Sequence, residues 1–130
     1  MSVRVAENVK TTILEFISDL KDVIFTGSAD RGDLLLVEFF FKKMNTTSVT
    51  EHIVSHVLPH KNKIKDRDVQ FFIDQKRQIF AGLPEDRVSY FADLVQRTKD
   101  EGGLADDDKD TIWSYFDTLL VLAEEYKKKK

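Results

Sequence analysis

The sequence predicts an all-α fold, a single compact bundle of about six helices. Apolar residues recur every three or four positions over most of the 130 residues, which is the spacing of one helix face. Capping residues, prolines and glycines mark where one predicted helix ends and the next begins. A hydrophobic content of 42%, with ten Phe residues, is enough for one core, whereas the chain is too short to expect two domains. We therefore expect residues 1–130 to form one helical domain with a short basic tail at about 127–130.

The first predicted helix runs from about Val5 to Phe25. Its apolar residues share one face at helical spacing: Val9, Ile13, Phe16, Ile17, Leu20 and Ile24. The stretch "TGSADRGD" then breaks the helix, because its two glycines favour a loop. Within it, Asp30 or Asp33 is positioned to cap the next helix by accepting hydrogen bonds from its first amides.

The next segment, "LLLVEFFFKKM" (residues 34–44), is apolar on nearly every side. A short apolar run fits either a buried strand or a central helix, and its helical neighbours and the Lys42, Lys43 pair near its end favour the helix. A helix that is hydrophobic all round must be covered, and 130 residues leave little chain for this, so the segment predicts self-association. Glu38 would then need a Lys, an Arg or water as its partner, or a raised pKa.

A short third helix is expected in "NTTSVTEHIVSHVLPH" (residues 45–60). Ser48 and Glu51 have capping-box spacing, in which each side chain accepts a hydrogen bond from an amide that the helix leaves unpaired. Pro59 ends the segment, since proline cannot continue the helical hydrogen bonds.

Three further helices complete the bundle. After a basic loop, "HKNKIK", Asp66 is the expected N-cap of a fourth helix that ends at Gly82. Pro84 opens a fifth helix, which ends before Gly102. The acidic link "LADDDKD" precedes the last helix, whose apolar stripe consists of Ile112, Phe116, Leu119, Leu120 and Ala123.

Aromatic residues of the fourth and the last predicted helix provide the candidate partner contacts. In the helix after Asp66, Lys76 lies within the apolar stripe and must extend past it, while Phe71 points to the opposite, polar side. Phe71 is thus either an ordinary exposed aromatic or a contact with another protein. Trp113 and Tyr115 flank the stripe of the last helix, where they either close the core or contact a partner. The stripe after Asp66 consists of Val69, Phe72, Ile73, Ile79 and Phe80.

A basic cluster is the candidate phosphate contact. Its members are Lys61, Lys63, Lys65 and Arg67. Together with the lysine tail, this cluster makes a nucleic-acid-associated protein the main alternative function. Nearby aspartates and a net charge of −3 instead favour a solvated loop, because specific binding also requires base-stacking or base-edge groups on the same face.

Three histidines are weak candidates for a metal site. His52 and His56 share a helix face at the spacing by which two imidazoles hold zinc, and His60 follows Pro59. The glutamate of the HExxH motif is missing, so a His-based metalloprotein is an unlikely alternative. We expect no cofactor and no catalytic residues, because no nucleophile, phosphate loop or carboxylate pair stands out.

The second half of the chain carries a family resemblance. The segments "VLPHKNKIKDRDVQFFIDQKRQIFAGLPEDRVSYFADL" and "DKDTIWSYFDTLLVLAEEY" contain, in order, a proline before a basic loop, an Arg-Asp and Phe-Phe helix, and an Ile-Trp-x-Tyr helix. Over about residues 57–126 the chain resembles small helical proteins of unknown function encoded by large nucleocytoplasmic DNA viruses, the Marseillevirus-like viruses among them. The resemblance implies a viral protein of the host cytoplasm or viral factory, without catalytic residues to carry over.

The expected location is intracellular. "MSVRVAENVK" lacks the apolar core of a secretion signal, and the longest apolar run, "LLLVEFFF", is short and contains a glutamate, so neither secretion nor a membrane span is expected. The absence of cysteine fits a reducing cytoplasm or, alternatively, the nucleus. The sequence thus predicts a non-enzymatic protein-interaction or structural protein that binds another protein or itself, with a role in viral assembly or host interaction as the more specific hypothesis.

Overall fold

A computed structural model describes residues 2–129, and within that range every regular element is helical. Six α-helices have ten or more residues and α4 has five, which confirms the predicted all-α bundle and makes residues 34–41 helical. The elements, in order, are α1 (Ser2–Asp19), η1 (Leu20–Ile24), α2 (Ser28–Lys43), α3 (Thr46–Val57), η2 (Leu58–His60), α4 (Lys61–Lys65), α5 (Gln70–Ile79), α6 (Glu85–Gln96), η3 (Lys99–Glu101) and α7 (Asp106–Lys129).

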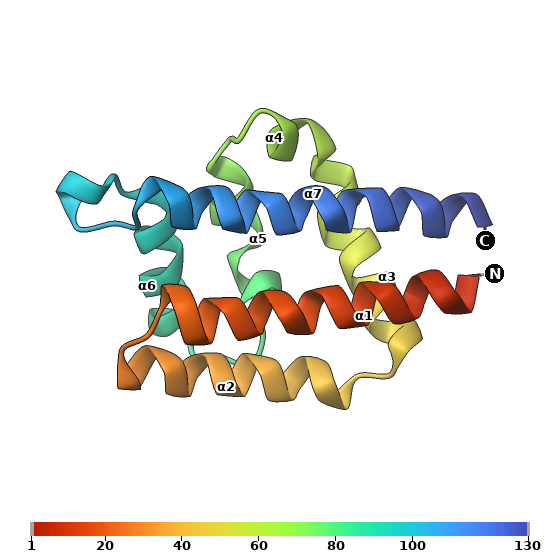
Figure 1. Ribbon diagram of the computed structural model, residues 1–130, viewed down its shortest axis with the longest axis horizontal. Coiled ribbons are helices and arrows are strands. Elements are labelled where there is room, and N and C mark those ends of the chain that lie inside the picture. Colours follow the sequence, from red (N-terminus) through yellow and green to blue (C-terminus); the bar gives the residue numbers. More distant parts are fainter. Residues whose placement is uncertain (1, 130) are drawn as a thin grey trace.

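The helices form two layers (Figure 1). In one layer α1 lies between α2 and α7 and runs antiparallel to both, so that the start of α1 and the end of α7 lie at the same end of the molecule. Helices α3, α5 and α6 cross this layer steeply, and α3 contacts both α1 and α7. This arrangement places α2 at an edge of the first layer, where only part of its circumference is covered.

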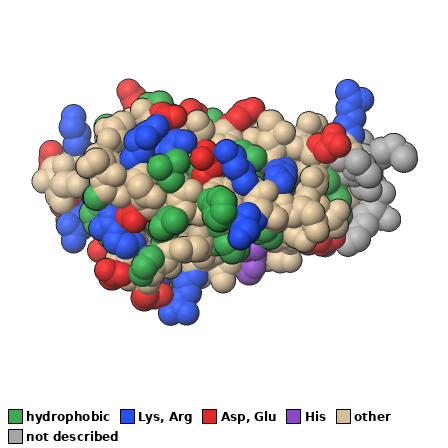
Figure 2. All heavy atoms as spheres, turned by 90° about the horizontal axis from the view of Figure 1, so that it is seen from below, with side chains coloured by type: hydrophobic (Ala, Val, Ile, Leu, Met, Phe, Trp, Pro, Cys, Tyr) green, Lys and Arg blue, Asp and Glu red, His purple; other side chains and the backbone are tan. Residues whose placement is uncertain are grey.

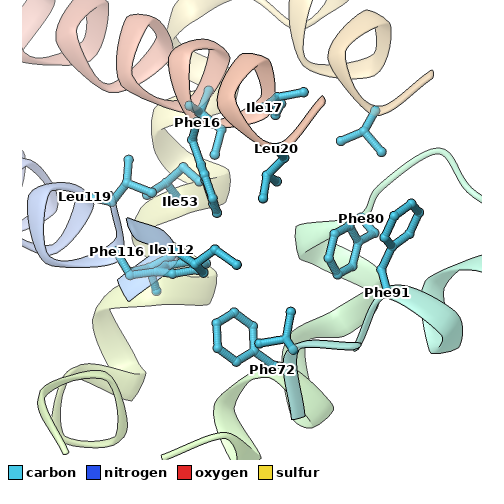
Figure 3. Close-up of a cluster of buried hydrophobic side chains, with 14 of the residues drawn as sticks. Phe16, Ile17, Leu20, Ile53, Phe72, Phe80, Phe91, Ile112, Phe116 and Leu119 are labelled. Carbon is cyan, nitrogen blue, oxygen red and sulfur yellow. The ribbon is translucent and has the colours of Figure 1, made fainter. Parts of the chain in front are cut away.

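An aromatic core fills the space between the layers (Figure 3). Phe116 of α7 lies at its centre, with its ring centroid 5.4 Å from Phe16, 5.1 Å from Phe71 and 5.5 Å from Phe72. These edge-to-face arrangements are the ones that aromatic pairs prefer. Side chains from α1, α3, α5, α6 and α7 therefore converge on one continuous core, as the high Phe content predicts.

The first predicted helix has the expected extent. Helix α1 and the π-helical turn η1 together cover residues 2–24, and the amide of Phe25 closes the turn by donating to the Leu20 carbonyl at 2.6 Å. Of the six apolar residues predicted to face the core, five are buried and Ile24 is half-buried. Helical spacing alone was enough here because α1 packs on its neighbours with a single face.

Helix starts differ from several predicted caps. Helix α2 begins at Ser28, before the predicted caps Asp30 and Asp33, and both of these carboxylates bind Arg87 instead. Helix α3 begins one turn earlier than its predicted capping box, because the Asn45 side chain accepts a hydrogen bond from the Ser48 amide at 2.8 Å. The first suitable side chain on the chain therefore caps α3, not the one with the fuller motif.

The segment between α3 and α5 is helical rather than the predicted basic loop. The turn η2 and helix α4 occupy residues 58–65, because the fully buried Ile64 anchors this segment to the core. Asp66 ends α4 instead of capping α5, which begins only at Gln70.

The end of α6 also differs from the prediction. Helix α6 ends at Gln96, earlier than predicted, and the turn η3 precedes Gly102. Of the predicted basic tail, Lys127–Lys129 belong to the last turn of α7, and Lys130 lies outside the described residues. Within residues 2–129, no helix is both long and apolar enough to cross a membrane.

Candidate protein-interaction face on helix α2

Helix α2 carries large apolar side chains on two opposite sides. Leu34, Val37 and Phe41 are buried against the bundle. On the outward side, Leu35, Leu36, Phe39 and Phe40 expose 42%, 52%, 60% and 37% of their surface. We call these four outward residues the α2 apolar face.

The α2 apolar face lies on the surface that Figure 2 shows. Viewed from the side of α2, several groups of hydrophobic side chains lie along the middle of the molecule, with other side chains between them and Lys and Arg side chains around them. A Leu or Phe side chain presents on the order of 200 Å², so the four exposed fractions leave about 400 Å² of apolar surface in contact with water. Patches of this size on a soluble domain often mark interaction sites.

Charged groups surround the patch at the C-terminal end of α2. The Lys43 ammonium lies 4.9 Å from the centre of the Phe39 ring, in a cation–π arrangement. Glu38 is largely shielded from solvent and pairs with Lys21 at 3.3 Å and with Lys42 at 3.7 Å. Of the alternatives that the sequence left open for Glu38, a lysine partner is the one present, and the patch has a basic rim at this end.

Arg87 of α6 fixes the N-terminal end of α2. Its guanidinium donates to Asp33 at 2.5 Å and to Asp30 at 3.0 Å, and it lies 4.4 Å from the centre of the Tyr90 ring. The hydroxyl of Tyr90 also donates to Asp30, and burial together with this carboxylate raises the pKa of Tyr90. Gly82, at a φ of 94°, brings the α5–α6 connection against Leu36 and Phe40 from the inner side. The patch is thus presented on a helix that is tied down along its length.

Phe71, one of the predicted partner contacts, is not on the surface. Its side chain is fully buried and packs on Phe116 and on Phe72, while the His60 ring lies 5.6 Å away on another side. The prediction was wrong because it treated the helix after Asp66 as covered on one face only. The folded-back segment η2–α4 covers the second face, so two adjacent Phe residues are both buried.

The two aromatic residues of α7 face the bundle as well. Trp113 exposes only 6% of its surface and lies 4.8 Å from the Phe72 ring. Tyr115 stacks on Phe16, with ring centroids 4.9 Å apart, and its hydroxyl donates to Asp19 of α1. Burial, followed by the Asp19 carboxylate, raises the pKa of Tyr115 to about 12. The sequence left open whether Trp113 and Tyr115 close the core or contact a partner. In the structure both side chains pack on the core.

The predicted phosphate contacts are paired with carboxylates. Lys61 lies 3.1 Å from Glu124, Lys63 lies 3.0 Å from Asp74, and Arg67 lies 2.7 Å from Asp117. These pairs connect α4 and its C-terminal turn to α5 and α7, because α4 folds back between the two helices. Lys65 is exposed, and its positive charge helps to lower the pKa of Asp117, the carboxylate that also pairs with Arg67. Three carboxylates therefore offset most of the charge of the four cations in this cluster.

Arg67 has a structural role at the end of α4. Its φ of 55° is the left-handed conformation in which helices commonly end, and its guanidinium donates to the Ile64 carbonyl and to both oxygens of Asp117. The side chain also covers the Trp113 ring at 5.6 Å. The hydrogen bonds to Asp117 raise the pKa of Arg67 and lower that of Asp117.

The three histidines do not converge on one point. The His52 and His56 rings are 4.8 Å apart, but His52 Nε2 bonds the Gln78 carbonyl at 3.2 Å and His56 Nδ1 bonds the Gln75 side chain at 3.1 Å. His60 instead lies against Phe71. Within the described part of the chain, no three His, Cys, Asp or Glu side chains are grouped as a metal site requires.

His52 and His56 border a small cavity in the core. Its volume is about 20 Å³, enough for about one water molecule, and its lining is apolar except for these two rings and Gln78. Burial lowers the pKa of His52, and repulsion from His56 adds to the effect, although the Gln78 carbonyl opposes it. The pair is therefore a polar lining of the core, joining α3 to the end of α5.

Comparisons with known proteins return no matching family model, curated protein or solved structure. The functional reading therefore depends on the residues alone. Sequence reasoning identified residues 34–44 as unusually apolar but did not name the four residues of the α2 apolar face. A helical wheel of this segment contains the missing signal, because it shows two apolar faces where a bundle edge covers only one.

Proposed function

We propose that this chain is a non-enzymatic helical protein that acts by binding another protein chain through the α2 apolar face. One observation carries the proposal: four large apolar side chains lie next to one another on the outward side of a helix that the bundle holds in place. A stable monomer gains nothing from that exposure, whereas an interface would bury it.

The size of the patch sets the strength of binding that it can support. Burying about 400 Å² of apolar surface releases roughly 10 kcal/mol at about 25 cal/mol per Å². Association itself costs on the order of 4 to 15 kcal/mol, so this patch supports reversible binding rather than a permanent complex. The basic rim of Lys42 and Lys43 then provides orientation more than affinity.

The alternative functions have less support. A nucleic-acid role would use the basic cluster Lys61, Lys63, Lys65 and Arg67 together with the lysine tail. Within that cluster Lys61, Lys63 and Arg67 already pair with carboxylates of the chain. A role in viral assembly or host interaction rests on the resemblance of residues 57–126, and the α2 apolar face lies outside that stretch. It remains a prediction about the setting in which the face operates.

A pull-down tests the proposal. The chain, coupled through its N-terminal amine so that Lys42 and Lys43 stay unmodified, is incubated with source-cell lysate with and without nuclease, alongside Phe39→Glu and the control Val121→Glu. Val121 is equally exposed, at 63%, but lies on α7. We expect specific proteins that resist nuclease and are lost with Phe39→Glu only. Proteins that all three forms retain equally, or that nuclease releases, would contradict it.

A further inference from the structure

On the outward side of α2, side-chain size increases from the N-terminal end to the C-terminal end. Residues at spacings of four, seven, eight, eleven and fifteen share one side of a helix. On α2 these positions hold two small residues, then two leucines, then two long side chains. In order they are Ser28, Gly32, Leu35, Leu36, Phe39 and Lys43, and all are exposed. If a second copy of this stripe runs in the opposite direction, its two long side chains therefore lie opposite the two small residues of the first copy, and leucine lies opposite leucine.

We propose that α2 pairs with α2 of a second copy of this chain, antiparallel, around a twofold axis between Leu35 and Leu36. This inference rests on the proposed function and names its partner. In that register Leu35 faces Leu36 of the second copy, Gly32 faces Phe39, and Ser28 faces Lys43. In a twofold interface each such contact occurs twice, so each pairing of a large with a small side chain contributes twice to binding. Large residues seated opposite small ones are the condition for two helices to pack closely.

Gly32 gives independent support for this register. It lies inside α2, where glycine destabilises a helix relative to alanine because of its conformational freedom. Nothing in the chain requires glycine there: a Cβ atom would meet no atom within 4 Å, and the backbone is not in the left-handed region. A Phe side chain of a second copy that packs over Gly32 supplies a reason for the missing side chain.

Charge favours the antiparallel over the parallel direction. Around the start of α2, three carboxylates face two guanidinium groups: Asp22, Asp30 and Asp33 with Arg31 and Arg87. Around its end lie three lysines and one carboxylate: Lys21 and Lys42 pair with Glu38, and Lys43 lies over the Phe39 ring. An antiparallel pair brings the basic end of one copy over the acidic end of the other. The two helix dipoles then point in opposite directions, which is favourable. A parallel pair would place the two basic ends together.

The available area fits a weak dimer. Two copies of the α2 apolar face contribute about 800 Å² of apolar surface, and the ends of the two stripes bring the total toward the lower limit of specific interfaces, about 1,200 Å². We therefore expect a dimer that dissociates in the micromolar range.

Cysteine cross-linking tests the direction and register, since the chain contains no cysteine of its own. Ser28→Cys and Lys43→Cys proteins are treated with a short bis-maleimide, separately and as an equal mixture. In the antiparallel pair residue 28 of one copy lies about 22 Å from residue 28 of the other but next to residue 43. We expect cross-linked dimer mainly from the mixture. Cross-linking of each protein with itself would indicate parallel pairing, and cross-linking of neither would indicate no pairing; both results would overturn the inference.

Sedimentation equilibrium separates this inference from the proposed function. The unmodified chain and Val121→Glu should dimerise with the same dissociation constant, while Phe39→Glu should weaken dimerisation at least tenfold. A chain that stays monomeric over a broad concentration range overturns the homodimer. If that monomer still captures a lysate protein that Phe39→Glu loses, the α2 apolar face binds a different partner and the proposed function stands. If it captures none, both fail.

Discussion

At the scale of single residues, two adjacent Phe side chains illustrate how burial is decided. Phe71 and Phe72 expose at most 2% of their surface, although on a helix they point about 100° apart. Phe72 packs on Trp113 and Phe116, and Phe71 packs on Phe116 and His60. Both therefore belong to the core, and neither is available to a partner.

Truncating either Phe should have the same consequence. We expect Phe71→Ala and Phe72→Ala each to lower the free energy of unfolding by about 3 to 5 kcal/mol, because each leaves a cavity in a packed aromatic cluster. Urea denaturation measures the loss, and Phe39→Ala is the matched control from the exposed side of α2, with an expected change below about 1 kcal/mol at low protein concentration. A nearly unchanged stability for Phe71→Ala would show that its side chain is exposed after all.

His52 should make the stability depend on pH. Burial lowers its pKa in the folded chain, whereas in the unfolded chain the pKa returns to about 6.5. Between these two pKa values the unfolded chain binds more protons, so the free energy of unfolding falls as the pH falls below about 6.5 and levels off below the folded pKa.

Comparison with His52→Gln isolates this effect, because glutamine does not titrate. Chemical denaturation from about pH 7.5 to about pH 5.5 should give a smaller loss of stability for the variant than for the unmodified chain. Equal losses in both would mean that groups other than His52 cause the pH dependence.

At the scale of helices, the choice of cap shows where local rules become ambiguous. Asn45, Ser48 and Glu51 all suit the start of α3, and Asn45 is the one whose side chain accepts a hydrogen bond from a helix amide, that of Ser48. Similarly, Asp30 and Asp33 suit the start of α2 but bind Arg87 of α6 instead. Capping residues are therefore more numerous than helix starts, and tertiary contacts select among them.

Substitution of the two candidate caps of α3 distinguishes them. Asn45→Ala should lower the free energy of unfolding by about 1 kcal/mol, since the Ser48 amide loses its acceptor. Ser48→Ala, the control, should change it by less than about 0.5 kcal/mol, because Ser48 is exposed and contributes only its backbone to the cap. Thermal or urea denaturation of the two variants measures the difference, and the reverse order would restore the capping box of Ser48 and Glu51.

At the scale of the whole molecule, the layer order explains the exposed patch. Helix α1 is covered by α2, α3 and α7, whereas α2 lies at the edge of its layer (Figure 1). An edge helix with two apolar faces leaves one of them in water unless a second chain covers it. The free energy of that exposure is the reason to expect association.

Association should also appear as a concentration-dependent melting temperature. If the folded chain dimerises and the unfolded chain does not, mass action raises the melting temperature as the protein concentration increases, by about 3 to 6 °C for each kcal/mol gained. Phe39→Glu should remove the dependence, while Val121→Glu should retain it. A melting temperature that is independent of concentration for the unmodified chain would argue against self-association.

Three features of this protein followed from the sequence alone. They are the all-α class, the extent of the first helix and the expectation that Glu38 requires a partner or a raised pKa, of which a lysine partner is present. Each depends on neighbours along the chain or on the general cost of burying a charge, so a local pattern was sufficient. The high proportion of apolar residues in 34–44 also followed from the sequence, because composition does not depend on packing.

Only the tertiary structure decided which faces are covered. Arg67 pairs with Asp117, which is 50 residues away, and the basic segment that carries it lies on the core, with the His60 ring against the buried Phe71. The exposure of Phe39 and its neighbours depends in the same way on α2 lying at the edge of a layer. Helical periodicity identifies the apolar faces of each helix, but packing between distant segments determines which of those faces remain in water.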